Sequence, residues 1–340
     1  MAYDAQSDRI ILFGGRSGSQ SDGETWSFDA NHDAWVNLNP ASHPPARSGH
    51  AIAYDARADR MILFGGSSCC TPVVWFGDTW SYDYETNAWL NLTTASGPSP
   101  RVNHAMAYDN ESDTIVLFGG STASSIMNNE TWTYDFTTNT WTRVVQSPAP
   151  AWRYSQAMAY DAQSDRIVMF GGVNGRDQTW EYNVNTNAWV DVSRSGGPTG
   201  AVGAAIAYDS RADRVVLFGG EHPGPTNAQV ETRETWEFDV ESSVWANVTP
   251  DTGPSARSFH GIAYDSESAA LLLFGGENAQ RVVNGETWIR GTSSGLPPAP
   301  GAPPWVIISI VIVGVAAVAG GGYLLWSRRP REPRDGSGET

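Results

Sequence analysis

The tripeptide Phe-Gly-Gly recurs through most of the chain at nearly regular intervals. It begins at Phe13, Phe64, Phe118, Phe170, Phe218 and Phe274, and the intervals are 51, 54, 52, 48 and 56 residues. Tyr-Asp precedes it and Thr-Trp follows it in all six copies, and a second Trp follows in five of them. Recurrence at such a period predicts a repeat architecture in which each unit is one supersecondary element.

The distances between these marks show where the repeat varies in length. From the Asp of Tyr-Asp to the Phe of Phe-Gly-Gly there are always 9 residues, from the first Trp to the second always 9, and from the second Trp to the next Tyr always 19. Only the distance from that Phe to the first Trp changes, and it is 13, 16, 14, 10, 18 and 14 residues. All variation therefore falls in one connection.

Each unit has the pattern of four strands, as residues 50–92 illustrate. HAIAYD at 50–55, RMILFGG at 60–66, DTWSYD at 78–83 and AWLNL at 88–92 are separated by turn residues. The second run is apolar on both faces, which a strand needs when other sheets cover it from either side. The pattern predicts an all-β fold built from four-stranded sheets.

A four-stranded repeat with a double glycine, followed by spaced aromatic residues, resembles the Kelch repeat. The resemblance extends over residues 1–290, where six units share the same marks in the same order. It implies a β-propeller of the galactose oxidase and Kelch superfamily, with at least six four-stranded blades. A β-sandwich also consists of short strands and turns, but it does not repeat one register six times.

The first and last blades are expected to be incomplete. After Trp288 the chain reaches Gly291 and then Pro297, which stands 9 residues on, where a second Trp would fall. At the other end, Met1 lies inside a first strand. An unpaired edge invites aggregation, and propellers of this kind commonly close with a strand from the other end of the chain. We therefore expect a start upstream of Met1 that supplies the missing strand and a secretion signal.

An uncharged stretch of 22 residues runs from Trp305 to Trp326. As a helix it would span roughly 33 Å, against about 30 Å for the hydrocarbon core of a bilayer. Residues 291–304 before it form a Pro-rich stalk, and residues 327–340 after it contain four arginines. By the positive-inside rule these features predict one transmembrane helix in the plasma membrane, with the propeller outside and the tail in the cytoplasm.

The chain has 37 acidic and 21 basic side chains, and its net charge is −16. Such a surface repels phosphate backbones and argues against nucleic-acid binding. Cys69 and Cys70 are too few for a disulfide framework or a four-ligand zinc site, so the alternatives are a vicinal disulfide and two unpaired thiols. Sequons predict glycosylation of an exported domain at Asn91, Asn110, Asn129 and Asn247.

The connection that varies in length predicts the binding face. In an up-and-down blade, the loop between the second and third strands emerges at the same end as the connection to the next blade. Variable loops on rigid strands commonly carry binding residues, so we expect a protein or glycan partner there. The candidates lie outside the repeat pattern: Trp75, Phe76, Trp152, Tyr154 and His222. The alternative is that the aromatic rings pack over neighbouring blades.

Some polar residues recur with the repeat. His50, His104 and His260 stand four residues before Tyr-Asp, where other units have Gln156 and Ala204, which indicates repeat structure rather than catalysis. Arginines also recur, and we expect them to bond carbonyls or acidic turns: Arg47, Arg101, Arg153 and Arg257.

The resemblance also admits an enzyme, because the superfamily includes copper oxidases and sugar mutarotases. A copper radical site of that kind needs a Tyr crosslinked to a Cys, with further Tyr and His ligands, and no such set is identifiable in the sequence. We therefore expect a cell-surface binding module without a cofactor or metal. An extracellular carbohydrate-active enzyme on the same propeller is the alternative.

Overall fold

The computed structural model describes residues 1–69, 72–223, 229–291 and 305–308. These residues form six four-stranded antiparallel sheets, one for each copy of the repeat, and a short two-stranded hairpin. The all-β class and the propeller of six four-stranded blades are therefore confirmed.

The blades take their strands in chain order. Blades one to three are β1 (Ala2–Asp4), β2 (Arg9–Ser17), β3 (Gln20–Asp29), β4 (Ala34–Asn37); β5 (Ala51–Asp55), β6 (Arg60–Phe64), β7 (Thr79–Asp83), β8 (Ala88–Asn91); β9 (Ala105–Asp109), β10 (Thr114–Phe118), β11 (Thr131–Asp135), β12 (Thr140–Val144). Blades four to six are β13 (Ala157–Asp161), β14 (Arg166–Phe170), β15 (Thr179–Asn183), β16 (Ala188–Asp191); β17 (Ala205–Asp209), β18 (Arg214–Phe218), β21 (Thr235–Asp239), β22 (Val244–Asn247); β23 (Gly261–Asp265), β24 (Ala270–Phe274), β25 (Thr287–Gly291), β26 (Trp305–Ile308). The additional hairpin in blade five consists of β19 (Glu221–Pro223) and β20 (Gln229–Glu231).

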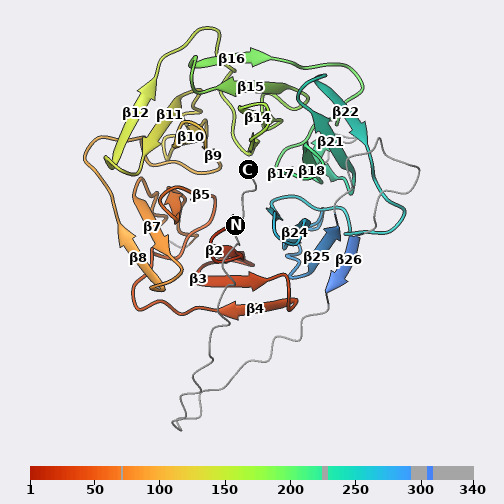
Figure 1. The fold of residues 1–340 in the computed structure, drawn as a ribbon. Coiled ribbons are helices and arrows are strands. Elements are labelled where there is room, and N and C mark those ends of the chain that lie inside the picture. The colour runs from red at the N-terminus through yellow and green to blue at the C-terminus, as the bar shows by residue number, and fades with distance from the viewer. Residues whose placement is uncertain (70–71, 224–228, 292–304, 309–340) are drawn as a thin grey trace, which may run out of the picture. The chain divides into compact units, whose positions relative to one another are not determined.

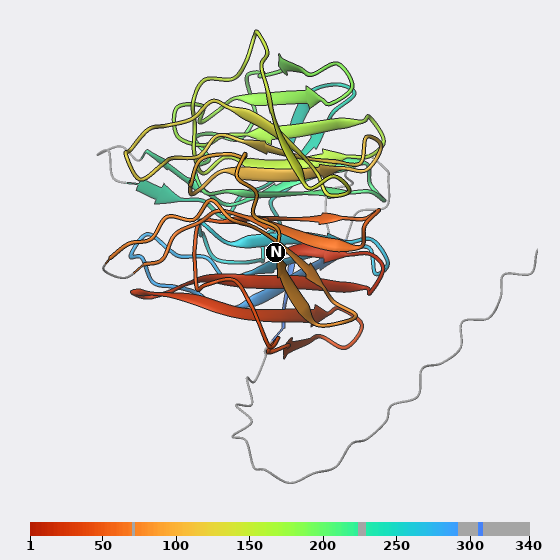
Figure 2. The same ribbon diagram turned by 90° about the vertical axis from the view of Figure 1, so that its left-hand side faces the viewer.

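The first strands of the blades surround a central axis. Each contacts the first strands of its neighbours, from β1 and β5 through β9, β13 and β17 to β23, and β23 contacts β1. Figure 1 shows this ring along the axis, and Figure 2 shows from the side that blade one, in red, lies next to blade six, in blue. Contacts between the two ends of the propeller therefore close the ring.

The Tyr-Asp mark forms the turn between the first two strands of each blade. In blade two, Asp55 Oδ1 accepts hydrogen bonds from the backbone N–H of Arg57 at 3.1 Å and of Ala58 at 2.9 Å. Tyr54 donates its hydroxyl to Asp59 Oδ1 at 2.9 Å, and Asp59 has a φ of 58°. An aspartate tolerates this left-handed conformation, and the bonds satisfy the turn backbone.

The double glycine ends the second strand where the next connection lies against it. Gly65 and Gly66 have φ values of 70° and 96°, which favour glycine. A Cβ atom on Gly65 would lie 2.7 Å from the carbonyl oxygen of Arg101, which no side chain allows. The glycine pair therefore permits a close approach between a blade and the connection that leaves it.

The second Trp fills the seam between blades. Trp89 of β8 is 4% exposed, and its ring centroid lies 5.0 Å from that of Phe13 in blade one and 5.0 Å from that of Tyr82 in its own blade. Its Nε1 donates to Thr25 Oγ1 of blade one at 2.9 Å. One residue therefore supplies both apolar packing and a satisfied buried hydrogen bond between sheets.

The sixth blade corrects an expectation drawn from the sequence. Its fourth strand is β26, which pairs with β25 and places Trp305 opposite Arg290. Trp305 thus has the register position of the second Trp in other blades, such as Trp89 opposite Tyr82. Because both the first and the sixth sheets have four strands, the expectation that these blades are incomplete is wrong. The strand comes from beyond the Pro-rich segment and not from upstream of Met1.

The predicted transmembrane helix is also wrong. Trp305–Ile308, the beginning of the apolar stretch, is a strand of the propeller. Its β-branched residues suit a strand as well as an apolar helix, so hydropathy did not distinguish the two. No helix among the described residues is long and apolar enough to cross a bilayer. Residues 292–304, 309–326 and 327–340, which include the predicted stalk and tail, lie outside the described residues.

Candidate binding site at the propeller axis

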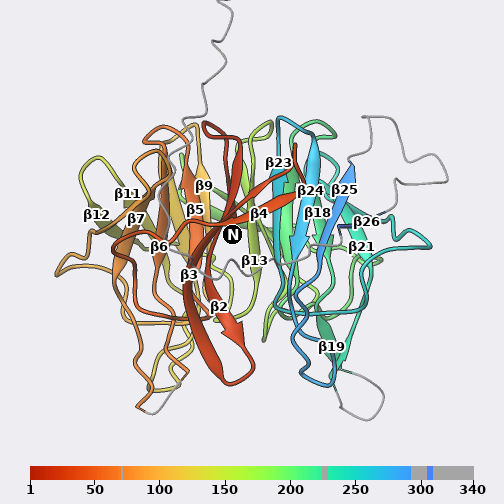
Figure 3. The same cartoon turned by 90° about the horizontal axis from the view of Figure 1, so that it is seen from below.

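The loops after the second strands and the connections between blades lie on one face, as the sequence predicted. Figure 3 shows the hairpin of β2 and β3 and the β19 hairpin projecting from the same end of the propeller. The connection residues pair with these loops: Ser48 with Ser67, Val102 with Ser121, Val202 with Glu221, and Ser258 with Glu277. The connections therefore support the bases of the variable loops.

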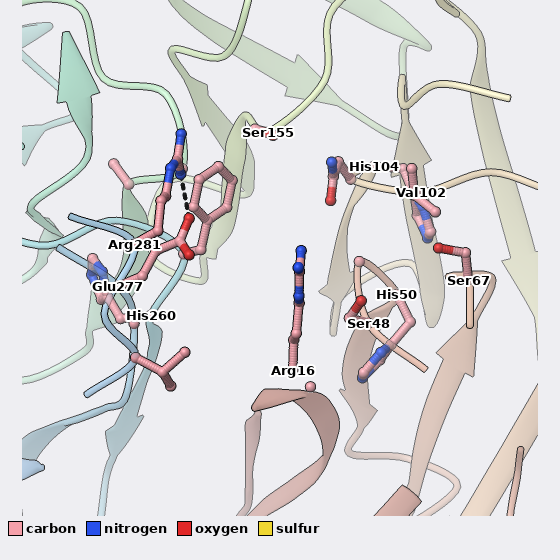
Figure 4. Close-up of a pocket in the computed structure, with 18 of the residues that line it drawn as sticks. Arg16, Ser48, His50, Ser67, Val102, His104, Ser155, His260, Glu277 and Arg281 are labelled. Carbon is pink, nitrogen blue, oxygen red and sulfur yellow. Dashed lines mark hydrogen bonds and ion pairs between the residues drawn. The ribbon is translucent and has the colours of Figure 1, made fainter. Parts of the chain in front are cut away.

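A cavity of about 770 Å³ opens at the axis on this face. Blade one and all five connections between blades contribute to its wall, which includes Arg16, His50, His104, Ser155, Gly203 and Phe259. Figure 4 shows Arg16 projecting into the cavity, with Arg281 on one side and Ser48 on the other. The structure thus gives this propeller a concave site of the size that binds ligands.

A series of four backbone hydrogen bonds forms part of the wall. Asn103 N–H donates to the Gly49 carbonyl at 2.7 Å, and Ser155 N–H donates to the Asn103 carbonyl at 2.8 Å. Gly203 N–H donates to the Ser155 carbonyl at 2.9 Å, and Phe259 N–H donates to the Gly203 carbonyl at 2.7 Å. All five residues have positive φ values, of 69°, 55°, 57°, 66° and 56° in chain order. Five connections are thereby linked in series around the axis.

The recurring histidines directly follow the residues of this hydrogen-bond series, and their side chains extend toward the preceding blade. His104 packs edge-on against Phe64 with a centroid distance of 5.5 Å, and Gln156 at the equivalent place donates to the Phe118 carbonyl at 2.8 Å. Burial lowers the pKa of His50 and of His260 to about 3, and burial with Arg101 nearby lowers the pKa of His104 well below 6.5. The imidazoles are therefore neutral, which supports their interpretation as repeat structure.

The cavity has one arginine whose charge is neutralised and one whose charge is not. Arg281 forms ion pairs with Glu277 and, at 3.6 Å, with Glu221 of blade five. The Nε of Arg16 donates to the Gly18 carbonyl at 2.8 Å, and within the described residues no carboxylate forms an ion pair with it. Arg16 is exposed, so its guanidinium is accessible to an anionic group in the cavity.

The recurring arginines hold the connections beneath the cavity. Arg101 is fully buried and donates to the Ser99 and Gly119 carbonyls, both at 3.0 Å, and to Glu130 at 2.7 Å. The other three make the corresponding bonds, with Asp78, Gln178 and Glu286 as the side-chain acceptors. The expectation that these arginines bond carbonyls or acidic turns is confirmed for all four, and Gln178 replaces the acid in blade four.

The predicted binding residues of blade two lie outside the axial cavity. Trp75 pairs with Ser67 at the base of its loop and is partly buried. The ring of Phe76 lies under the guanidinium of Arg47, with 4.0 Å between Cζ and the ring centroid. Phe76 therefore contacts the recurring arginine of the connection into its own blade, and a role for Trp75 or Phe76 in binding stays a prediction.

The other predicted binding residues lie apart from the cavity as well. Trp152 is 40% exposed on the connection into blade four, and its carbonyl accepts a bond from Asn174. Tyr154 is partly buried, and its carbonyl accepts from Val173 N–H at 3.0 Å. His222 is in β19 of blade five. Spread over three blades, these residues remain individual predictions of binding and do not form one site.

The predicted modification sites differ in what the structure shows. All four sequon asparagines, Asn91, Asn110, Asn129 and Asn247, are exposed. The Sγ of Cys69 accepts a hydrogen bond from Ser21 N–H at 2.7 Å, while Cys70 lies outside the described residues. Glycosylation and the vicinal disulfide therefore remain predictions.

Sequence reasoning missed the residues that give the cavity its chemistry. Arg16 belongs to no recurring mark, and its direction depends on the hairpin that carries it. A signal was present for Phe259, because it stands five residues before Tyr-Asp, where the other units have Gly49, Asn103, Ser155 and Gly203. A large aromatic residue among small turn residues marks this blade as different.

Known proteins share this repeat. The model of the KLHDC2/KLHL20/DRC7 Kelch-repeats domain matches residues 1–220 and 162–300. The chain is similar to Adagio protein 3 of Arabidopsis thaliana, with 27% identity over 176 residues, 50% of this chain and 28% of that protein. It is also similar to the putative adagio-like protein 2 of Oryza sativa subsp. japonica, with 28% identity over 177 residues, 50% of this chain and 27% of that protein. The chain thus matches about a quarter of the length of these relatives. Since the family model covers most of the propeller, the chain belongs to the KLHDC2/KLHL20/DRC7 Kelch-repeats domain family.

Proposed function

We propose that this propeller is a protein-binding module whose axial cavity receives an acidic segment of the partner. The observation that carries the proposal is the accessible guanidinium of Arg16 in a cavity of about 770 Å³. An arginine that pairs with no carboxylate among the described residues is free to form two parallel bonds with a carboxylate of a ligand.

The charge of the whole chain supports this choice of partner. With a net charge of −16, most of the surface repels an acidic segment, and Arg16 attracts it at the axis. Such an arrangement orients a partner and disfavours contacts elsewhere on the surface. Rigid walls also suit recognition. Because backbone hydrogen bonds link the five connections in series, the wall of the cavity needs little ordering when a partner binds.

A peptide array tests the proposal directly. Peptides that contain Asp or Glu are compared with counterparts that contain Asn or Gln, and hits are measured by fluorescence anisotropy against the full chain. We expect Arg16→Gln to weaken the acidic hits by roughly tenfold or more. Arg57→Gln is the matched control, because Arg57 is 74% exposed on the turn between β5 and β6 and pairs with Asp113 at 3.4 Å. Equal affinity for the two peptide sets, or equal losses in the two variants, would contradict the proposal.

The proposed role is binding without turnover. A carbohydrate-active enzyme remains the alternative, and incubation with a panel of oligosaccharides, followed by product analysis, separates the two. Location outside the cell is likewise a prediction, which mass spectrometry of the protein from its native cells tests at the four exposed sequons. Occupied sequons would support exposure to the secretory pathway.

A further inference from the structure

Phe259 has a backbone conformation that its residue type disfavours. Its φ is 56°, and the equivalent positions in the other connections between blades are occupied by Gly49, Asn103, Ser155 and Gly203. Glycine and asparagine adopt this region readily, whereas a bulky aromatic residue there is strained. The backbone hydrogen bond from its N–H to the Gly203 carbonyl, at 2.7 Å, holds the main chain in this conformation. Strain of this kind persists at sites where the side chain is needed.

The side chain of Phe259 also has an unusual degree of exposure. It is 45% exposed and lies in the wall of the cavity rather than in the core. Its ring lies on the backbone of Gly203, where an added Cβ would be 2.9 Å from the nearest ring atom. Gly203 therefore provides the space that sets the position of the ring. A rigidly placed aromatic ring in a concave site is the usual form of a binding anchor.

The same wall continues into the loop of blade six. Val283 is 42% exposed, lines the cavity and pairs with Glu277 at the base of the loop. Phe259 and Val283 thus give the cavity an apolar surface in addition to the cationic group of Arg16. A ligand that uses both needs an apolar group and an anionic group that fit together within this one cavity.

We propose that Phe259 anchors an aromatic side chain of the partner, next to the carboxylate that Arg16 binds. This inference rests on the proposed function, since it describes a second feature of the same acidic segment. Aromatic pairs gain offset or edge-to-face contact beyond the area they bury, so an aromatic residue is preferred over an aliphatic one at this position. The cavity then prefers acidic segments in which an aromatic residue lies next to the acidic residue.

Paired peptides test this selectivity. Each acidic hit is made with Phe and with Ala beside the acidic residue, and both are titrated into the full chain and into Phe259→Asn. We expect the wild type to prefer the Phe peptide by roughly tenfold and Phe259→Asn to lose that preference while still depending on Arg16. Phe259→Tyr keeps the ring and is expected to keep the preference. Val282→Asn is the control, because Val282 is 59% exposed in the same loop but is not part of the cavity wall.

Stability provides a readout that needs no ligand. Asparagine tolerates the left-handed conformation, so Phe259→Asn is expected to raise the melting temperature while it weakens binding. A lower melting temperature would overturn the inference, because the ring would then serve the fold. An unchanged preference for the Phe peptide in Phe259→Asn would overturn it as well, while the proposed function would stand. If no acidic peptide binds the wild type, the proposed function fails and this inference fails with it.

Discussion

Trp35 Nε1 donates a hydrogen bond to Thr287 Oγ1 at 2.9 Å, across 252 residues of sequence. The same bond joins Trp89 to Thr25, Trp141 to Thr79, Trp189 to Thr131 and Trp245 to Thr179. In each pair the Trp of one blade reaches the Thr of the Thr-Trp mark in the preceding blade. Because the Trp35 bond joins blade one to blade six, the seam that closes the ring uses the same contact as the seams within it.

Removing this bond should weaken the closure of the ring. Trp35→Phe keeps an aromatic ring but leaves Thr287, which is 1% exposed, without this donor. We expect the free energy of unfolding to fall by about 1–2 kcal/mol, measured by urea denaturation. Thr287→Val should have a similar effect, and the double variant should cost less than the sum of the two. Additive costs would show that the bond is not the origin of the effect.

The buried arginines should be far more important for stability than the surface arginines near them. Arg101→Ala would remove the bonds that this buried guanidinium donates to Glu130 and to two carbonyls, and we expect a loss of about 3–5 kcal/mol. Arg143 also pairs with Glu130, at 3.3 Å, but is 56% exposed, so Arg143→Ala should cost less than about 1 kcal/mol. Blade five has Ala201 in place of the arginine, which shows that a blade assembled without it is compatible with the fold. Equal losses for the two variants, by thermal and urea unfolding, would contradict this assignment.

The buried histidines should make the propeller less stable in acid. Their pKa values are lowered in the folded state, to about 3 for His50 and His260, so the unfolded chain binds protons below pH ~6.5 that the folded chain does not. Stability is fully present above pH ~6.5 and falls as the pH decreases toward the folded pKa, by up to about 1.4 kcal/mol per pH unit for each histidine.

Another blade has a glutamine at the position equivalent to His104, and substituting this residue isolates the effect of the histidine. His104→Gln reproduces the residue at position 156, whose Nε2 bonds the Phe118 carbonyl, so the fold should be retained. Urea unfolding between pH 7.5 and 4.5 should show a flatter pH dependence in this variant, with little change at pH 7.5. Parallel pH profiles for wild type and variant would contradict the burial of a neutral imidazole at position 104.

Truncations test how much the strand β26 contributes to the stability of the propeller. A chain that ends before Trp305 loses four pairing positions with β25, and at about 0.5–1.5 kcal/mol for each position we expect a loss of roughly 2–6 kcal/mol. A chain that ends after Ile310 keeps the whole propeller unit and should unfold like the full chain. Limited proteolysis and thermal unfolding measure both. Equal stability of the two truncations would show that β26 contributes nothing.

The sequence alone predicted the blades of the propeller, because each recurring motif forms its local structure through contacts between nearby residues. Tyr54, Asp55 and Asp59 form a turn with one another, and the glycines at 65 and 66 adopt conformations that other residues avoid. Six copies of such local signals in constant register leave few alternatives to blades. The face of the variable loops followed from the same register, since strand order determines which connections share an end of the sheet.

The sixth blade and the cavity depended on contacts between distant segments. Trp288 and Trp305 are 17 residues apart instead of 9, so the repeat spacing identified Pro297 where the structure places Trp305 in register. The apolar composition of Trp305–Ile308 is equally compatible with a transmembrane helix and with the outer strand of a blade. Only the pairing with β25 decides between the two. Arg16 and Phe259 are likewise brought to one cavity by ring closure, which joins residues more than two hundred positions apart. Local chemistry determined the blades, while their closure into a ring decided which side chains form the candidate site.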